Sequence, residues 1–232
     1  MTTGDVVISV CNVSVSYQVK QGFMKWSRHA PLKNISFDLH RGETLGIIGR
    51  NGAGKSSLLR MIAGIVEPDG GRIVNHGAKV SLLSLGVGFM PHLSGRDNAT
   101  LSGLLLGLSK REIQERMDAI IEFSELGDFI DRPLRTYSSG MRARLSFSTA
   151  LQINPDVLLL DEILGVGDEK FRAKSNAIIK QIIKSDKTVV LVSHQTPIIR
   201  ELCDRLVWIE DNHVKLIGDT SSVLKEYITS VK

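Results

Sequence analysis

The chain has 232 residues, of which 42% are apolar and 23% are charged, with a formal net charge of +4 and a sequence pI near 9.1. This length fits one α/β domain, and the apolar content is enough for a buried core. No apolar run approaches the roughly 18 residues that span a bilayer, and the first residues lack the features of a signal peptide. We therefore expect a chain that does not cross a membrane by itself. Its positive charge permits an anionic partner, such as a membrane surface, without requiring one.

The N-terminal part of the chain predicts β-strands. Residues 6–10 and 12–17 are rich in β-branched side chains and predict two strands. Tyr17 ends the second strand, where its ring has two uses: packing in a core or stacking on a flat base. Residues 18–31 then combine basic and large apolar side chains, including Trp26. This composition suits a loop that contacts a membrane interface or a partner, and equally a surface loop folded back on its own domain.

The next segment carries the strongest motif. Strands are predicted over 34–39 and 44–48, and a helix over 57–63, which ends at Gly64. Between strand and helix lies the phosphate-binding pattern G-x-x-x-x-G-K-S, spelled Gly49, Arg50, Asn51, Gly52, Ala53, Gly54, Lys55 and Ser56, with Ser57 next in the helix. In such a loop, backbone N–H groups and the helix N-terminus hold phosphates. Lys55 is then expected to reach the β- and γ-phosphates and the Ser56 hydroxyl to bind Mg²⁺.

Beyond this loop the chain first returns to strands and then becomes helical. Short strands predicted over 72–75 and 79–84 indicate a small β-rich subregion beside the α/β core. From about 93 to 150 the apolar spacing is helical, with repeats in which Leu101, Leu104, Leu105 and Leu108, and then Ile113, Met117, Ile120 and Ile121, recur.

The end of this helical region holds a second candidate phosphate contact. A helix is expected to run to about Gln152, and its N-terminus consists of Ser138, Ser139, Gly140 and Met141. Hydroxyl groups there serve either as N-caps or, together with free backbone N–H groups, as a phosphate site.

Two later strands end in polar side chains. The apolar run 157–160 is followed by Asp161 and Glu162, and the run 188–192 is followed closely by His194. Open α/β sheets bind ligands at the carboxyl ends of their strands. We therefore expect Asp161 to serve as a Mg²⁺ ligand, Glu162 to orient or deprotonate a water molecule, and His194 to contact the γ-phosphate. The remaining residues predict strands near 206–209 and 214–217 and a helix from about 221.

Together these motifs resemble the nucleotide-binding domains of ABC transporters, in order and approximate spacing over essentially the whole chain. The resemblance implies a single domain over residues 1–232: a P-loop NTPase of the α/β class with a RecA-like core, an antiparallel β subdomain and a helical subdomain at about 93–150. It also implies ATP and Mg²⁺ as cofactors and ATP hydrolysis, with Lys55, Glu162 and His194 as catalytic residues. In that family the aromatic side chain matching Tyr17 stacks on adenine.

The resemblance further implies a head-to-tail homodimer. Each ATP then lies between the phosphate loop of one subunit and the Ser138–Gly140 segment of the other. The family's D-loop falls near Gly165–Asp168, where Asp168 communicates across the dimer. One departure concerns the Q-loop: its usual glutamine is missing, and Leu85 stands about where it is expected.

A narrower resemblance rests on three segments, residues 85–98, 137–145 and 161–168. Their sequences resemble those of the subgroup that exports lipid-linked polysaccharides in bacteria. O-antigen is the first expectation, and capsular polysaccharide and teichoic acid are the alternatives. The resemblance implies a polytopic membrane permease that handles the substrate, and a peripheral position on the cytoplasmic face of the inner membrane. We expect no C-terminal carbohydrate-binding domain, and contact of Trp26 and its basic neighbours with the partner or the lipid diphosphate.

Two other classes of protein share parts of this pattern. A soluble ABC ATPase that acts on DNA or ribosomes shares the ATP site but usually adds coiled-coil insertions or a second cassette, so no nucleic acid partner is expected. A binding-only regulatory subunit would close on ATP without turnover. The presence of Lys55, Asp161, Glu162 and His194 argues against it, while the missing Q-loop glutamine favours it slightly.

Overall fold

The structure is a computed structural model that describes residues 4–20, 26–161 and 167–231. The chain divides into two compact units. Unit 1 contains residues 1–82, 156–162 and 182–232, and unit 2 contains residues 83–155 and 163–181. Among the described residues, no helix combines the length and apolar character needed to cross a bilayer.

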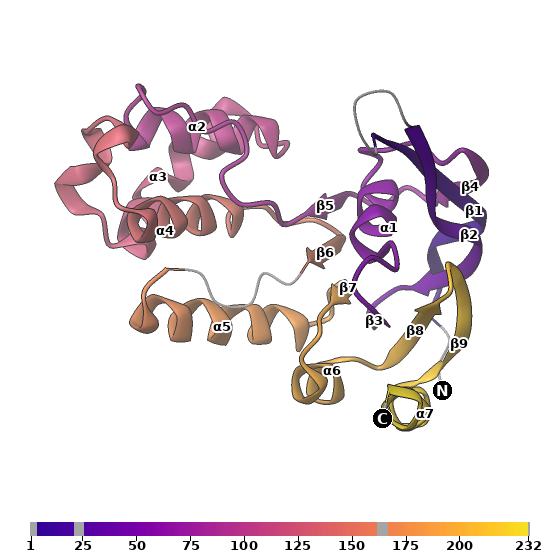
Figure 1. Ribbon diagram of the computed structural model, residues 1–232. Helices are drawn as coiled ribbons and strands as arrows, with labels where there is room; N and C mark the ends of the chain where they lie inside the picture. The colour runs from indigo at the N-terminus through magenta and orange to yellow at the C-terminus, as the bar shows by residue number, and fades with distance from the viewer. Residues whose placement is uncertain (1–3, 21–25, 162–166, 232) are drawn as a thin grey trace. The chain divides into compact units, whose positions relative to one another are not determined.

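Unit 1 contains two sheets (Figure 1). The smaller sheet is antiparallel, in the order β2-β1-β4, with bounds β1 (Val6–Lys20), β2 (Trp26–His40) and β4 (Gly70–Asn75). The larger sheet has the order β5-β6-β7-β3-β8-β9 and is parallel except for β9, with bounds β3 (Thr44–Gly49), β5 (Val80–Leu82), β6 (Val157–Asp161), β7 (Thr188–Val192), β8 (Arg205–Glu210) and β9 (His213–Asp219). Its helices are α1 (Lys55–Ile62), α6 (Thr196–Leu202) and α7 (Thr220–Val231).

The core of unit 1 joins apolar side chains of both sheets to α1. Strands β6, β7, β3 and β8 are buried almost throughout, as expected for parallel strands covered on both faces. Helix α1 contributes Leu58 and Leu59, both fully buried, to the same cluster. The central position of β3 therefore fixes the phosphate loop that follows it.

Unit 2 is helical. It contains α2 (Gly95–Leu105), α3 (Lys110–Ser124), the 3₁₀ turns η1 (Gly127–Asp131) and η2 (Leu134–Thr136), α4 (Ser139–Ala150) and most of α5 (Glu169–Ile183). Helix α3 begins with a capping box in which Ser109 and Glu112 satisfy each other's backbone N–H groups. Phe123, Phe147 and Phe171 pack as a ring cluster with centroids 5.5 to 6.1 Å apart.

The structure differs from the sequence prediction at the first hairpin. Residues 18–20 and 26–31, expected as part of a loop, continue β1 and β2, with Lys20 paired to Trp26 in the antiparallel register. The two predicted N-terminal strands are one strand, interrupted at Asn12, whose φ of 51° marks an irregular register. The residues between 20 and 26, which carry part of the predicted interface, lie outside the described residues.

Two further differences concern β5 and α2. Strand β5 does not join the small sheet but pairs in parallel with β6 at the edge of the large sheet. In α2 the leucine repeat is not the buried face, because Leu104 is 45% exposed and Leu105 57% exposed. This helix instead buries small and polar residues, namely Gly95, Asn98, Ala99, Ser102 and Gly103.

Candidate functional site

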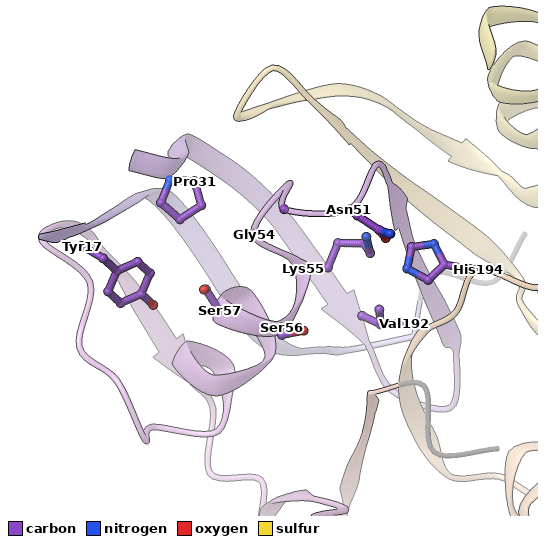
Figure 2. Close-up of a pocket in the computed structure, with 10 residues that line it drawn as sticks. Tyr17, Pro31, Asn51, Gly54, Lys55, Ser56, Ser57, Val192 and His194 are labelled. Atoms are coloured by element: carbon purple, nitrogen blue, oxygen red, sulfur yellow. The ribbon is translucent and has the colours of Figure 1, made fainter. Parts of the chain in front are cut away.

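A hollow of about 420 Å³ lies in unit 1 beside the start of α1. It is lined by Tyr17, Pro31, Asn51, Gly52, Gly54, Lys55, Ser56, Ser57, Val192 and His194. Figure 2 shows Tyr17 and Pro31 at one end of this pocket and Asn51, Lys55 and His194 at the other. The pocket therefore has an aromatic end and a polar end. Sequence reasoning missed Pro31, which it had placed in a loop, and Val192, which carries no chemical signal.

The backbone of the phosphate loop depends on glycine. Gly52 has φ of 81° and Gly54 has φ of 87°, a region that other residues rarely adopt. A Cβ on Gly54 would lie 2.7 Å from Leu32 Cγ and 3.0 Å from the Pro31 carbonyl oxygen, whereas a Cβ on Gly52 would meet nothing within 4 Å. Strand β2 thus packs directly against the loop at Gly54 and supports it from one side.

Lys55 is the cation of this loop. It is the first residue of α1 and is only 6% exposed. Its Nζ donates hydrogen bonds to the carbonyl oxygens of Gly49 (2.9 Å) and Arg50 (3.0 Å). A buried ammonium needs such partners, and these contacts keep its charge next to the N-terminus of α1, where a phosphate is favoured. Ala53 donates its backbone N–H to the Arg50 carbonyl at 3.2 Å and closes the loop as a turn.

The ends of β6 and β7 bring further polar groups to the same edge of the sheet. Asp161 ends β6 and is paired in register with Val192 of β7, which lines the pocket. His194 follows β7 and lines the pocket itself. Lys55, Ser56, Asp161 and His194 therefore belong to one unit and one sheet edge, as the strand order requires. Glu162 lies outside the described residues.

The other candidate residues belong to unit 2. Ser138 caps α4, its Oγ accepting a hydrogen bond from the Met141 N–H at 3.1 Å. Ser138 and Ser139 are exposed, and Gly140 and Met141 are half-buried. The phosphate loop and this segment thus lie in different units of the chain.

Asp168 precedes α5 and is linked to α4. Its Oδ1 accepts a hydrogen bond from the Phe171 N–H at 3.0 Å, and its Oδ2 lies 3.7 Å from Nη1 of Arg144. The hydrogen bond from Phe171 is the main reason that the pKa of Asp168 lies below its usual value, and the charge of Arg144 lowers it further. The contact between Arg144 and Asp168 was not predicted from the sequence, because only the fold brings α4 beside Asp168.

The residues of the pocket, together with Asp161 at the end of β6, fit a nucleoside triphosphate with Mg²⁺. The polar end offers a lysine ammonium, glycine backbone and a helix N-terminus, which suit phosphates. The Ser56 hydroxyl and the Asp161 carboxylate are oxygen ligands of the kind that Mg²⁺ prefers. At the other end, the Tyr17 ring and Pro31 suit a flat base.

Comparison with known proteins identifies the family. The sequence profile of the ABC transporter family matches residues 32–165. The chain belongs to the ABC transporter family. This ABC chain is 46% identical over 204 residues to the O-antigen export system ATP-binding protein RfbB of Klebsiella pneumoniae, covering 88% of the chain and 83% of that relative. It is also 46% identical over 196 residues to the teichoic acids export ATP-binding protein TagH of Lactococcus lactis. That alignment covers 84% of the chain and 42% of TagH.

Solved structures show the same fold. The dimeric structure of a post-hydrolysis state of the ATP-binding cassette MJ0796, bound to ADP and Pi, aligns with a TM-score of 0.72 at 22% identity, over 92% of this ABC chain and 98% of that chain. The predicted family and the predicted fold class, a P-loop NTPase with an antiparallel subdomain and helices, are both confirmed.

Proposed function

We propose that this chain is the ATP-binding and ATP-hydrolysing subunit of an exporter that moves a lipid-linked polysaccharide, with O-antigen as its cargo, across the bacterial inner membrane. ATP binding is supported by the pocket around Lys55. The cargo is supported by the 46% identity to an O-antigen export ATP-binding protein over 83% of that relative. Export of teichoic acid is the second candidate, favoured by the similarity to TagH over less than half of TagH's length.

In the proposed site, the work on the γ-phosphate is positioning and charge neutralisation. The Lys55 ammonium and the N-terminus of α1 bind the phosphates, and Ser56 and Asp161 hold Mg²⁺. His194 contacts the γ-phosphate, and Glu162 orients the attacking water. A Mg²⁺ ion held by Ser56 and Asp161 would supply positive charge that neutralises the phosphates. Tyr17 stacks on the base, and the backbone from Gly49 to Ser57 encloses the phosphates.

We further propose that two copies form a head-to-tail dimer. Each nucleotide is then completed by Ser138, Ser139, Gly140 and Met141 of the other copy, with Asp168 beside them. ATP stabilises the closed dimer because it contacts both copies, and hydrolysis removes those contacts, so that the nucleotide drives closing and opening by binding two conformations unequally. A polytopic permease on the inner membrane carries the polysaccharide, and the chain acts at its cytoplasmic face.

The proposal is tested in a bacterium from which this protein has been deleted. Polysaccharide on the cell surface is measured with an antibody or on gels, together with lipid-linked polysaccharide retained inside. The deletion should abolish the surface polymer, the wild-type chain should restore it, and Lys55→Met should not. Lys110→Met, an exposed lysine of unit 2, is the matched control and should restore it. A deletion strain with normal amounts of every surface polysaccharide would contradict the export function.

A further inference from the structure

Unit 2 contains a hydrogen-bonded cluster around the buried side-chain amide of Asn98, which is not part of the candidate site. Asn98 lies in the first turn of α2 and is 0% exposed. Its Oδ1 accepts from the Met90 N–H at 2.6 Å. Its Nδ2 donates to the carbonyl oxygens of Met90 (3.0 Å), Leu93 (3.1 Å) and Ser94 (2.8 Å). One side chain therefore holds residues 90–94 in a closed loop, which we call the amide-held loop.

The amide-held loop is bonded in turn to η2, which precedes α4. The N–H groups of Leu134 and Arg135 donate to the carbonyl oxygens of Leu93 and Pro91, at 2.8 and 2.7 Å. Because backbone hydrogen bonds of this length fix two segments against each other, the position of η2 follows that of the loop.

A second contact joins the start of α2 to Tyr137, the residue before the N-cap of α4. Tyr137 is 3% exposed, and its Oη donates to the Phe129 carbonyl oxygen at 2.5 Å. A Cβ on Gly95, the first residue of α2, would lie 2.1 Å from this Oη, so the start of α2 packs directly on the tyrosine. Ser138, the N-cap of α4, follows immediately.

We propose that Asn98 is a positioning residue for the N-terminus of α4: through the amide-held loop and η2 it fixes Ser138 and Met141. This inference rests on the proposed function in one respect, namely that the Ser138–Met141 segment contacts the nucleotide of a second copy. Contacts of that kind depend on placement to within a fraction of an ångström. Asn98 itself is fully buried, and its side-chain hydrogen bonds go to the backbone of residues 90–94. We therefore expect it to act on the nucleotide through the position of the backbone.

The direct test is amide hydrogen exchange, followed by NMR, in Asn98→Asp. This substitution keeps the shape but replaces the Nδ2 donor with an oxygen that faces three carbonyl oxygens. The Leu134, Arg135 and Met141 amides should exchange at least about tenfold faster, because local opening becomes easier. The matched control is Asn75→Asp in unit 1, where the amide likewise bridges to Ala78 N and O at 2.8 Å. The control should leave the Leu134, Arg135 and Met141 amides unchanged.

Faster exchange at Met90 with wild-type exchange at Met141 would overturn the inference, because Asn98 would then act only on its own loop. Should Asn98→Asp fail to fold, Asn98→Ala removes the bonds without adding repulsion and is judged by the same three amides. Tyr137→Phe separates the two contacts: it should speed exchange at Met141 and leave Met90 unchanged.

The functional readout separates positioning from general damage. Binding of ATP to the pocket, which lies in unit 1, should keep its wild-type affinity in Asn98→Asp, whereas ATP-driven pairing of Glu162→Gln chains should weaken by at least about tenfold when Asn98→Asp is added. Unchanged pairing would reject the positioning role. If chains with native Asn98 do not pair in ATP, the proposed dimer fails, and the exchange measurement still decides whether Asn98 positions α4.

Discussion

At the scale of single residues, Lys55 is central to the proposed site. Its ammonium is buried, donates to two loop carbonyls and lines the pocket. Lys55→Met should lower the affinity for Mg-ATP about 10- to 100-fold, the loss of a charged hydrogen bond worth about 1.5 to 3 kcal/mol. Titration calorimetry measures this directly, with Lys110→Met as the control. Equal affinities in the two variants would remove Lys55 from the site.

Glu162 provides the kinetic counterpart. Glu162→Gln keeps a similar shape but cannot accept a proton, so it should bind ATP normally and hydrolyse it roughly 10²- to 10⁴-fold more slowly, the typical worth of a positioned general base. Single-turnover hydrolysis and nucleotide binding are measured on the same sample. Near-normal turnover in this variant would assign the water-orienting role to another group.

Cys203 gives a prediction about stability and pH. Burial, and then the charge of Asp204, raise the pKa of this thiol from 9.0 to about 12 in the folded chain. Above pH 9 the unfolded chain loses this proton while the folded chain keeps it, so this group's contribution to stability falls as the pH rises from about 9 to about 12. The slope should reach about 1.4 kcal/mol per pH unit.

Urea denaturation at several pH values, compared with Cys203→Ala, isolates this slope from the titration of lysines. The difference in unfolding free energy between the two chains should change across that window. A constant difference would show that the Cys203 thiol has the same pKa in the folded chain as in the unfolded chain.

At the scale of elements, the phosphate loop packs directly against β2. Gly54 requires its glycine for two reasons, the positive φ and the contact with Leu32, whereas Gly52 requires it for φ alone. Gly54→Ala should therefore lower the unfolding free energy by about 2 to 5 kcal/mol, combining strain and overpacking. Gly52→Ala should cost about 1 to 2 kcal/mol. Chemical denaturation compares the two variants, and an equal loss in both would mean that β2 does not press on the loop.

The elements also show how far sequence reasoning extends. The strand-loop-helix around Lys55, the N-cap of α4 and the strands ending at Asp161 and near His194 follow from local patterns, and the structure contains them. The extension of β1 and β2 across residues 18–20 and 26–31 was missed, because antiparallel pairing depends on a partner strand rather than on composition.

Other features required tertiary information. Helix α2 carries a leucine repeat that predicts a buried face, yet it buries Asn98 and Ser102. The Asn98 side chain is buried because it forms hydrogen bonds to the backbone of the loop at residues 90–94. The parallel pairing of β5 with β6 and the approach of Arg144 to Asp168 join segments far apart in sequence. No local pattern encodes such contacts, so these parts of the fold and the candidate site were not predictable.

At the scale of the whole molecule, the two kinds of nucleotide contact that we propose come from two different units of the chain. The pocket around Lys55 belongs to unit 1, and the Ser138–Met141 segment belongs to unit 2. In the proposed dimer each nucleotide uses unit 1 of one copy and unit 2 of the other. We propose that this arrangement makes closure of the dimer depend on ATP and links hydrolysis to the movement of a membrane partner.

The most direct test of this account is purification of the protein from its native membranes in detergent, with the associated proteins identified and ATPase activity measured with and without them. We predict that a polytopic membrane subunit co-purifies and changes the rate of ATP hydrolysis, and that lipid-linked polysaccharide accompanies the complex. A protein that stays in the soluble fraction and hydrolyses ATP only together with nucleic acid or ribosomes would contradict the export function while leaving the ABC family fold intact.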